Sequence, residues 1–272
     1  MSIVVRATIP NPPTDMVTPA TTDAIMSTLS ISLALAAVLS AIVLWWRERS
    51  PVPFLIVLGG GTAALIEPIV DVLGGCWYPR HGGWTAFHLF GTPVPIWAVA
   101  NYFWYVGGIA YLALRYITRH PSRHTFWKMC ALVATVDVVQ EAPTVFLHIY
   151  HYWGQQPLNP YGFPLWWAAV NAGLPLVGAM LIYKLAPVLT GWRVLLIIPL
   201  MPMVDGLVNG ATAWPAWLAL NSNWPMFLTQ AAGVAVFGLA ALLYWAMGHL
   251  LFPEPADGGA PVMTAAEADA AH

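Results

Sequence analysis

Long apolar stretches alternate with short polar connections along the chain. Seven stretches are each close to the ~20 residues that a helix needs to cross about 30 Å of hydrocarbon. They cover residues 23–46, 53–73, 94–116, 126–148, 164–185, 192–213 and 225–251. The pattern predicts an all-α polytopic membrane protein whose seven transmembrane helices form one domain over residues 23–251. Residues 1–22 and 252–272 are rich in Pro, Thr, Ala or acidic residues and are expected to be disordered.

Composition and charge agree with a membrane protein. Only 8% of the residues are charged and 59% are hydrophobic, whereas a soluble domain carries about 25% charged residues. The formal net charge is −2 and no basic cluster occurs, which excludes nucleic acid as an expected partner. The first residues lack a basic segment followed by a cleavage site, so no removable signal peptide is expected.

The positions of the basic residues predict the orientation. Positive charge gathers after the first, third and fifth stretches, while the alternate connections contain only Arg80. The positive-inside rule therefore predicts an N-terminus outside and a C-terminus inside. A seven-helix retinal protein would need a lysine in the last helix, and residues 225–251 contain none. The charges that carry the orientation are Arg47, Arg49, Arg115, Arg119, Arg123, Lys128, Lys184 and Arg193.

Acidic residues occur in pairs inside the apolar stretches. Asp137 and Glu141 are one helical turn apart and therefore lie on the same helix face. Ionisable groups at membrane depth are costly and rarely face lipid, so each needs a partner, a cavity or a proton. Interhelical hydrogen bonds contribute only ~0.6–2 kcal/mol and could come from Gln or Ser, which makes a purely structural role a weak explanation. Similar pairs are Glu67 with Asp71 and Asp205 with Asn209.

These polar positions recur at a fixed spacing. Glu67 and Asp71 are followed 70 positions later by the second acid pair, and Asn101 is followed 70 positions later by Asn171. Gln230 takes the place of the asparagine in a degenerate third copy. We therefore expect one leading helix followed by three repeated helical hairpins, with the polar groups in one layer in the outer half of the bilayer.

Further residues are candidates for binding an apolar substrate. The outer connections 74–91 and 149–163 are rich in aromatic residues, which could cap a cavity or rest in the membrane interface. Tryptophans in the helices serve packing more often than ligand binding. No His-x-x-x-His or Glu-x-x-His pattern lies within a stretch, so no metal site is expected. The candidates are Asn101, Asn171, Asn209, Gln230, Trp97, Trp104, Trp167, Tyr102, His88 and His148.

Two other features bear on the fold. Cys76 and Cys130 are expected on opposite sides of the membrane, which excludes a disulfide between them. Gly59, Gly60 and Gly61 are not followed by Lys-Ser/Thr and do not form a phosphate loop. They predict a close approach of two helices.

The chemistry that suits paired carboxylates is proton transfer. Two such groups in a medium of low dielectric share a proton, so one acts as general acid and its neighbour as general base. No cofactor is expected for such chemistry. The candidate catalytic residues are Asp137, Glu141, Glu67, Asp71 and Asp205.

Four short motifs resemble the AveC-type spirocyclase family. They are Glu67-Pro68, Asn101-Tyr102-Phe103-Trp104, Asp137-Val138-Val139-x-Glu141 and Phe163-Pro164-Leu165. The resemblance spans the second to fifth predicted helices and is weak in the last two. It implies a membrane enzyme that closes a spiroketal from a keto-diol polyketide, with acidic residues at Glu67, Asp137 and Glu141.

Two other functions are open at this point. A proton-coupled small-molecule transporter would use the same acids as a relay, although no matching acids occur in the inner half. An acid-initiated membrane terpene cyclase would account for the many aromatic residues. Each alternative predicts the same partners, the lipid bilayer and an apolar small molecule, in a multi-pass protein of the cell membrane. The oligomeric state is open.

Overall fold

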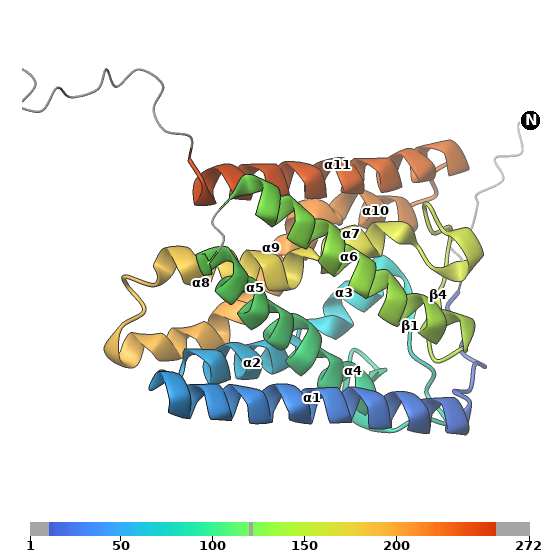
Figure 1. Ribbon diagram of the computed structural model, residues 1–272. Helices are drawn as coiled ribbons and strands as arrows, with labels where there is room; N and C mark the ends of the chain where they lie inside the picture. Colours follow the sequence, from blue (N-terminus) through green and yellow to red (C-terminus); the bar gives the residue numbers. More distant parts are fainter. Residues whose placement is uncertain (1–10, 120–121, 254–272) are drawn as a thin grey trace, which may run out of the picture.

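The computed structural model describes residues 11–119 and 122–253, and its helices run side by side along one axis (Figure 1). Five helical segments are long and apolar enough to cross a membrane. Each begins and ends within three residues of a predicted stretch, which indicates a multi-pass membrane protein. The segments are α1 (Ala20–Glu48), α6 (Arg123–Phe146), α7 with α8 (Leu165–Asn171, Gly173–Leu185), η3 with α9 (Gly191–Leu196, Ile197–Thr212) and α11 (Met226–Leu251).

The second predicted stretch is a broken helix. It consists of α2 (Val52–Ala63) and α3 (Glu67–Gly74), which are bent by 43° relative to each other and pass as a sixth candidate span only when counted together. Proline lacks the backbone N–H of a helix and its ring clashes with the preceding turn. Pro68 in the first turn of α3 accounts for the break. The bend places Glu67 at the start of the second segment.

The third predicted stretch is helical but irregular. It comprises α4 (Ile96–Asn101), the π-helical η1 (Tyr102–Gly108) and α5 (Ile109–Arg119), while Val94 and Pro95 belong to a strand. A Cβ atom added to Gly60 would lie 2.3 Å from the backbone nitrogen of Gly107 in η1. The predicted close approach of helices at Gly60 is therefore confirmed.

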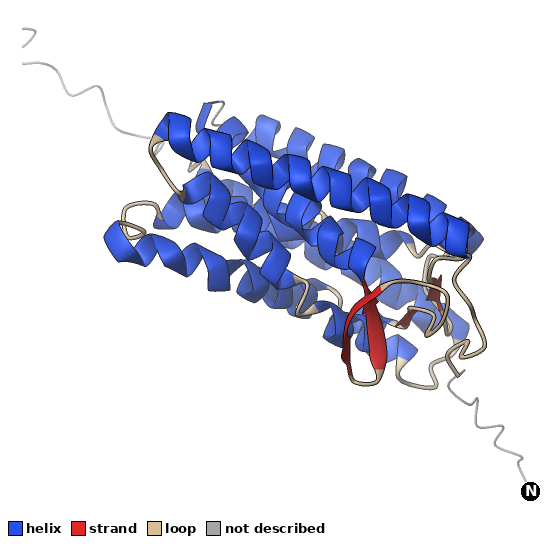
Figure 2. Cartoon of the chain, turned by 90° about the horizontal axis from the view of Figure 1, so that it is seen from below, coloured by secondary structure: helices blue, strands red, loops and turns tan. Residues whose placement is uncertain are grey.

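Two small antiparallel sheets, which the sequence pattern did not predict, lie in or next to the connections 74–91 and 149–163, for which the name outer connections is kept from the predicted orientation (Figure 2). Strand β1 (Cys76–Trp77) pairs with β4 (His151–Tyr152) and so joins the two aromatic connections. Strand β2 (Thr85–Leu89) pairs with β3 (Thr92–Pro95) in a hairpin. The first of these sheets brings residues from both connections to the end of the helix bundle.

The prediction of disorder over residues 1–22 is wrong for its described part. Helix α1 already begins at Ala20, Val17 forms a bridge with His81, and the backbone N–H of Trp84 donates to Asp23 Oδ2 over 3.1 Å. Backbone hydrogen bonds to the outer connection order this segment. Residues 1–10 and 254–272, for which disorder was also predicted, lie outside the described residues.

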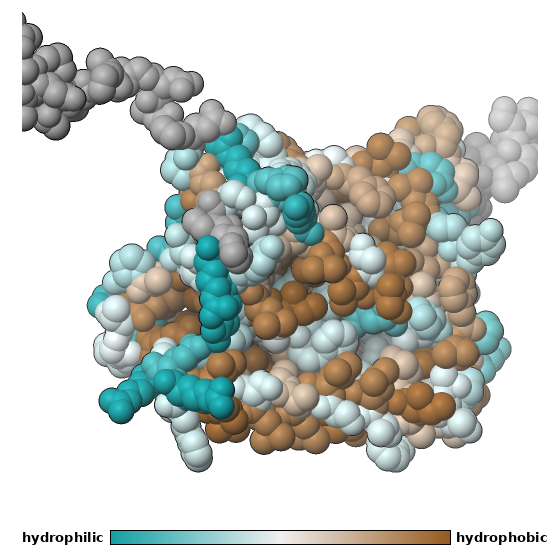
Figure 3. Space-filling model, in the orientation of Figure 1, coloured by the Kyte–Doolittle hydropathy of each residue, from teal (hydrophilic) through white to brown (hydrophobic). Residues whose placement is uncertain are grey.

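The remaining elements complete the bundle. The short helix α10 (Trp214–Leu220) packs against α3 and α11, and the 3₁₀ turn η2 (Pro160–Gly162) precedes α7. Trp166 and Phe126 are fully buried in the core, and Cys76 and Cys130 are free thiols. On the face shown in Figure 3, hydrophobic residues cover much of the surface with paler residues between them, and the most strongly hydrophilic residues gather at the left-hand end, opposite the strands.

Candidate functional site

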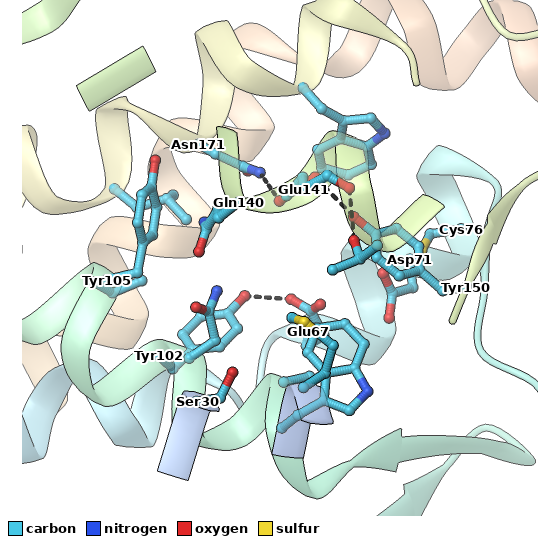
Figure 4. A pocket seen from close by; sticks show the side chains of 18 of the residues that line it. Ser30, Glu67, Asp71, Cys76, Tyr102, Tyr105, Gln140, Glu141, Tyr150 and Asn171 are labelled. Carbon is cyan, nitrogen blue, oxygen red and sulfur yellow. Dashed lines mark hydrogen bonds between the residues drawn. The ribbon is translucent and has the colours of Figure 1, made fainter. Parts of the chain in front are cut away.

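A cavity of about 350 Å³ lies inside the bundle, next to strand β1. Its walls come from α1, α3, α4, η1, α6 and α7, with single contributions from α8 and α9. Figure 4 shows acids from opposite sides of the bundle facing this space. The lining includes ten of the fifteen predicted site residues, namely Glu67, Asp71, Glu141, Asn101, Asn171, Asn209, Trp97, Trp104, Trp167 and Tyr102.

Glu67 is held by two phenols. Its Oε1 atom accepts a hydrogen bond of 2.6 Å from Tyr78, which lies in the outer connection after β1. Its Oε2 atom accepts a hydrogen bond from Tyr102, in the π-helical segment. The break before α3 turns this helix away from the axis of α2. The turn directs the Glu67 carboxyl group into the cavity. Both oxygens therefore have fixed positions.

Glu141 has three donors from two directions. Tyr150 and Tyr152 donate to its Oε2 atom over 3.1 and 3.0 Å, and Asn171 on α7 donates to its Oε1 atom over 2.9 Å. Tyr150 and Tyr152 reach the same carboxyl group from either side of His151, because alternate residues of an extended segment point the same way. The side chain remains half-buried because it faces the cavity.

The phenols of the outer connections stay protonated. Burial raises the pKa of Tyr78, Tyr150 and Tyr152 well above the usual value for tyrosine. The negative charge of Glu67 raises the pKa of Tyr78 further, and that of Glu141 does the same for Tyr150 and Tyr152. A neutral phenol can donate its proton to a hydrogen bond. These three tyrosines are therefore hydrogen-bond donors to the cavity acids throughout the neutral pH range.

The three aspartates are more deeply buried than the glutamates. Asp71 lines the cavity beside the Cys76 thiol, and its Oδ2 atom has no hydrogen-bond partner among the described residues. Asp137 and Asp205 are fully buried and do not line the cavity. Asn209 donates to Asp205 over 2.8 Å. These two predicted catalytic residues therefore lie behind the cavity wall and not at its surface.

Asp137 lies behind the cavity wall. Gln140, which does line the cavity, approaches Asp137 Oδ1 to 3.5 Å. The phenol of Tyr105 lies beside the same aspartate, but the Tyr105 hydroxyl and Asp137 Oδ2 both lack a hydrogen-bond partner within the described segments. Asp137 therefore contacts the cavity only indirectly, through neighbours such as Gln140 and Tyr105 that line it.

Aromatic rings close the end of the cavity that lies next to strands β1 and β4. Trp97 and Tyr150 are stacked with their ring centres 5.7 Å apart, and Tyr78 lies 5.6 Å from Tyr150. Tyr152 lies 5.8 Å from Trp167. The aromatic connections were expected either to cap a cavity or to rest in the membrane interface, and these residues cap the cavity. Other aromatic residues of the same connections, including Trp84 and Tyr161, are exposed.

Three predicted binding residues lie away from the cavity. His88 and His148 are exposed, and neither is among the lining residues. Gln230 accepts a hydrogen bond of 2.9 Å from the backbone N–H of Leu158 and so anchors an outer connection. The prediction failed for Gln230 because α11 packs on the outside of α6, α7 and α8 and contributes nothing to the lining.

Sequence reasoning missed several lining residues. Tyr105, Gln140 and Cys76 had not been considered for the site, and Tyr78, Tyr150 and Tyr152 had been considered only as general aromatic residues. The signal available was the Tyr150-x-Tyr152 spacing, which places both phenols on one side of an extended segment. Within residues 11–119 and 122–253, no group of three His, Cys, Asp or Glu side chains could hold a metal ion.

Removing the two phenol hydroxyls that hold Glu141 is expected to destabilise the protein. In the double variant Tyr150→Phe with Tyr152→Phe, Glu141 retains only the Asn171 donor. We expect the free energy of unfolding to fall by about 1–3 kcal/mol for each hydroxyl removed, as measured by thermal or denaturant unfolding in detergent. Tyr161→Phe is the matched control because Tyr161 is 88% exposed in the same connection. Equal stability of the double variant and this control would contradict the assigned hydrogen bonds.

The comparisons with known proteins leave the site to be interpreted from its geometry. No protein-family model matches the chain, and no curated protein and no solved structure shows significant similarity to it.

Proposed function

We propose that this protein is a membrane-embedded, spirocyclase-like enzyme that cyclises an apolar, polyketide-like substrate by acid/base catalysis. The observation that carries the proposal is that Glu67 and Asp71 on α3 and Glu141 on α6 face one cavity closed at its outer end by aromatic rings. Such a cavity excludes bulk water while holding both a proton donor and a proton acceptor. The short motifs that resemble AveC-type spirocyclases include two of these acids, Glu67 and Glu141, but not Asp71.

Spiroketal closure needs two proton transfers from the protein to the substrate and two from the substrate to the protein. One substrate hydroxyl attacks the carbonyl carbon, its proton passes to a carboxylate, and the carbonyl oxygen takes a proton from a carboxylic acid. The resulting hemiketal hydroxyl is then protonated and leaves as water. The second hydroxyl attacks the oxocarbenium carbon and gives up its proton to the carboxylate. The net change is the loss of one water molecule, with no oxidation or reduction.

The hydrogen-bond partners suggest which acid takes which role. Glu141 accepts three hydrogen bonds, an arrangement that suits a carboxylate acting as general base. Asp71 has a buried oxygen without a donor, which suits a carboxylic acid that gives its proton to the substrate. Glu67 lies opposite Glu141, with two phenols that fix its position. We assign Asp137 and Asp205 positioning roles because neither lines the cavity.

The proposal includes a topology of seven spans in the cell membrane, with the N-terminus outside and the C-terminus inside. On this topology the helical run from Ile96 to Arg119, the third along the chain, also crosses the membrane and brings the number of spans to seven. The π-helical segment η1 interrupts this run. Basic residues gather at the ends of α1, α5 and α8 and support this orientation. On this topology the cavity opens from the outer half of the bilayer. The internal repeat stays a prediction from the sequence.

Mass spectrometry of lipid-soluble metabolites tests the proposal. A strain that lacks this protein should accumulate a compound heavier by one water molecule than a product found in the parent strain. Re-expression of the protein should restore the product, and a strain with the same metabolites as its parent would contradict the proposal. Conversion of a polyene that carries no keto-diol would instead indicate a terpene cyclase, which the stacked Trp97 and Tyr150 would also suit.

Proton-coupled transport is the less favoured alternative. A transport path would have to continue through the inner half of the bundle. There the side chains of Ile56, Ile117 and Phe126 are fully buried, and the backbones of Gly60 and Gly107 are in contact. Proton-driven uptake into vesicles that contain the purified protein would nevertheless establish it.

A further inference from the structure

The cavity is open on one side, between α1 and α6. Leu29 and Leu33 on α1 are 52% and 38% exposed, and Val139 on α6 is 68% exposed. All three also line the cavity. A side chain that is exposed on the outer surface of the bundle and also lines an internal cavity must lie at an opening. We call Leu29, Leu33 and Val139 the portal rim.

The packing of α1 explains this opening. Helix α1 packs against α2, α4 and η1, so its cavity-facing residues are not covered by α6. In the space-filling view, less hydrophobic residues are visible between the hydrophobic surface of α1 along the bottom and the hydrophobic surface above it (Figure 3). The opening is therefore a gap in the wall of the bundle, at a depth where the surrounding helices are apolar.

The route from the aqueous side is closed at the same time. Tyr78, Trp97 and Tyr150 are 3%, 6% and 3% exposed and pack against one another at the outer end of the cavity. Ser30 on α1 and Gln140 on α6 directly follow the rim residues Leu29 and Val139 in the sequence, and both are polar and line the cavity. A molecule that enters between α1 and α6 passes apolar side chains first and hydrogen-bonding groups second.

We propose that the gap between α1 and α6 is a lateral portal through which the cavity takes its ligand directly from the hydrocarbon of the membrane. The ligand class is a membrane-dissolved amphiphile, with an apolar body and a few hydroxyl or carbonyl oxygens. The apolar rim favours molecules that partition into lipid, and Gln140, Asn171 and the acids supply partners for oxygens. The inference rests on the proposed function only in treating the cavity as a substrate site.

Carbodiimides of different solubility test this route in lipid vesicles. The O–H of a carboxylic acid adds across one C=N bond of the reagent, and the O-acylisourea formed rearranges to a stable N-acylurea that retains all atoms of both molecules. The probes are dicyclohexylcarbodiimide, which dissolves in lipid, and a water-soluble cationic carbodiimide. Peptide mass spectrometry measures modification of Glu67, Asp71 and Glu141. We expect the lipid-soluble reagent to modify at least one of them several-fold faster.

Bulky substitutions at the rim sharpen the test. Val139→Trp is expected to slow modification by the lipid-soluble reagent several-fold, and Leu29→Trp on the opposite side should do the same. Leu132→Trp is the matched control and should react like the wild type. Leu132 is 63% exposed on the same helix, about two turns away, and does not line the cavity. Circular dichroism and thermal unfolding verify that each variant is folded.

Three outcomes would overturn the portal. They are equal reaction with the water-soluble reagent, unchanged labelling in both rim variants, and failure of the lipid-soluble reagent to modify any cavity acid in the wild type. Labelling needs no turnover, so it distinguishes the two proposals. If the cavity acids are labelled as expected but no cyclic product forms, the portal is supported and the cyclase function is contradicted. If a cyclic product forms but the labelling does not follow the expected pattern, the cyclase function is supported and the portal is contradicted.

Discussion

Glu141→Gln is expected to lower turnover of a keto-diol substrate by about 10²–10⁴-fold, the range that removal of a general acid or base usually produces. Glutamine has nearly the same size but its amide cannot accept a proton at neutral pH. Formation of the spiroketal, with loss of one water molecule, is measured by mass spectrometry on purified protein in vesicles. The partners Tyr150, Tyr152 and Asn171 remain in place, so the variant should stay folded.

The control for this experiment is the same substitution outside the cavity. Glu48 pairs with Arg115 over 2.7 Å at the C-terminal end of α1, and Glu48→Gln should leave turnover unchanged. Glu67→Gln should be impaired like Glu141→Gln because Glu67 also faces the cavity. Asp137→Asn should have a smaller effect because Asp137 does not line it. Wild-type turnover by both glutamate variants would remove these residues from the mechanism.

Gly60→Ala is expected to destabilise the protein strongly for a single substitution. An added Cβ atom would lie 2.3 Å from the nitrogen and 2.4 Å from the Cα atom of Gly107, and two backbones cannot relieve such a clash by rotating a side chain. We expect the free energy of unfolding to fall by about 1–3 kcal/mol or more, as for overpacked cores. Displacement of η1 would also move Tyr102 away from Glu67. Denaturant unfolding in detergent measures the loss.

Gly206→Ala is the matched control for this prediction. Gly206 also lies within a helix, but a Cβ atom added there would meet nothing within 4 Å. Alanine is intrinsically better in a helix by about 1 kcal/mol, so this variant should be as stable as the wild type or more so. If Gly60→Ala matched Gly206→Ala in stability, the close contact between α2 and η1 would not exist in the folded protein.

Local sequence pattern was sufficient for the helices that cross the membrane. A continuous apolar stretch of about 20 residues has few alternatives in a bilayer, because every backbone polar group must be paired within the segment. The bounds of α1, α6 and α11 therefore follow from hydropathy alone. The same argument predicted that Glu67 and Glu141 must face a cavity or a partner, since charged groups in lipid are costly.

Tertiary structure decided which of the polar residues meet. The spacing of Asp137 and Glu141 placed them on one helix face but could not show that only Glu141 reaches the cavity. The phenols that hold Glu141 come from a connection whose path depends on pairing between β1 and β4, which are far apart in sequence. Gln230 was misplaced for a similar reason, because its neighbours depend on how α11 packs. Helical periodicity predicts the direction of a side chain within its own helix, whereas its partners depend on the arrangement of all the helices and on the connections between them.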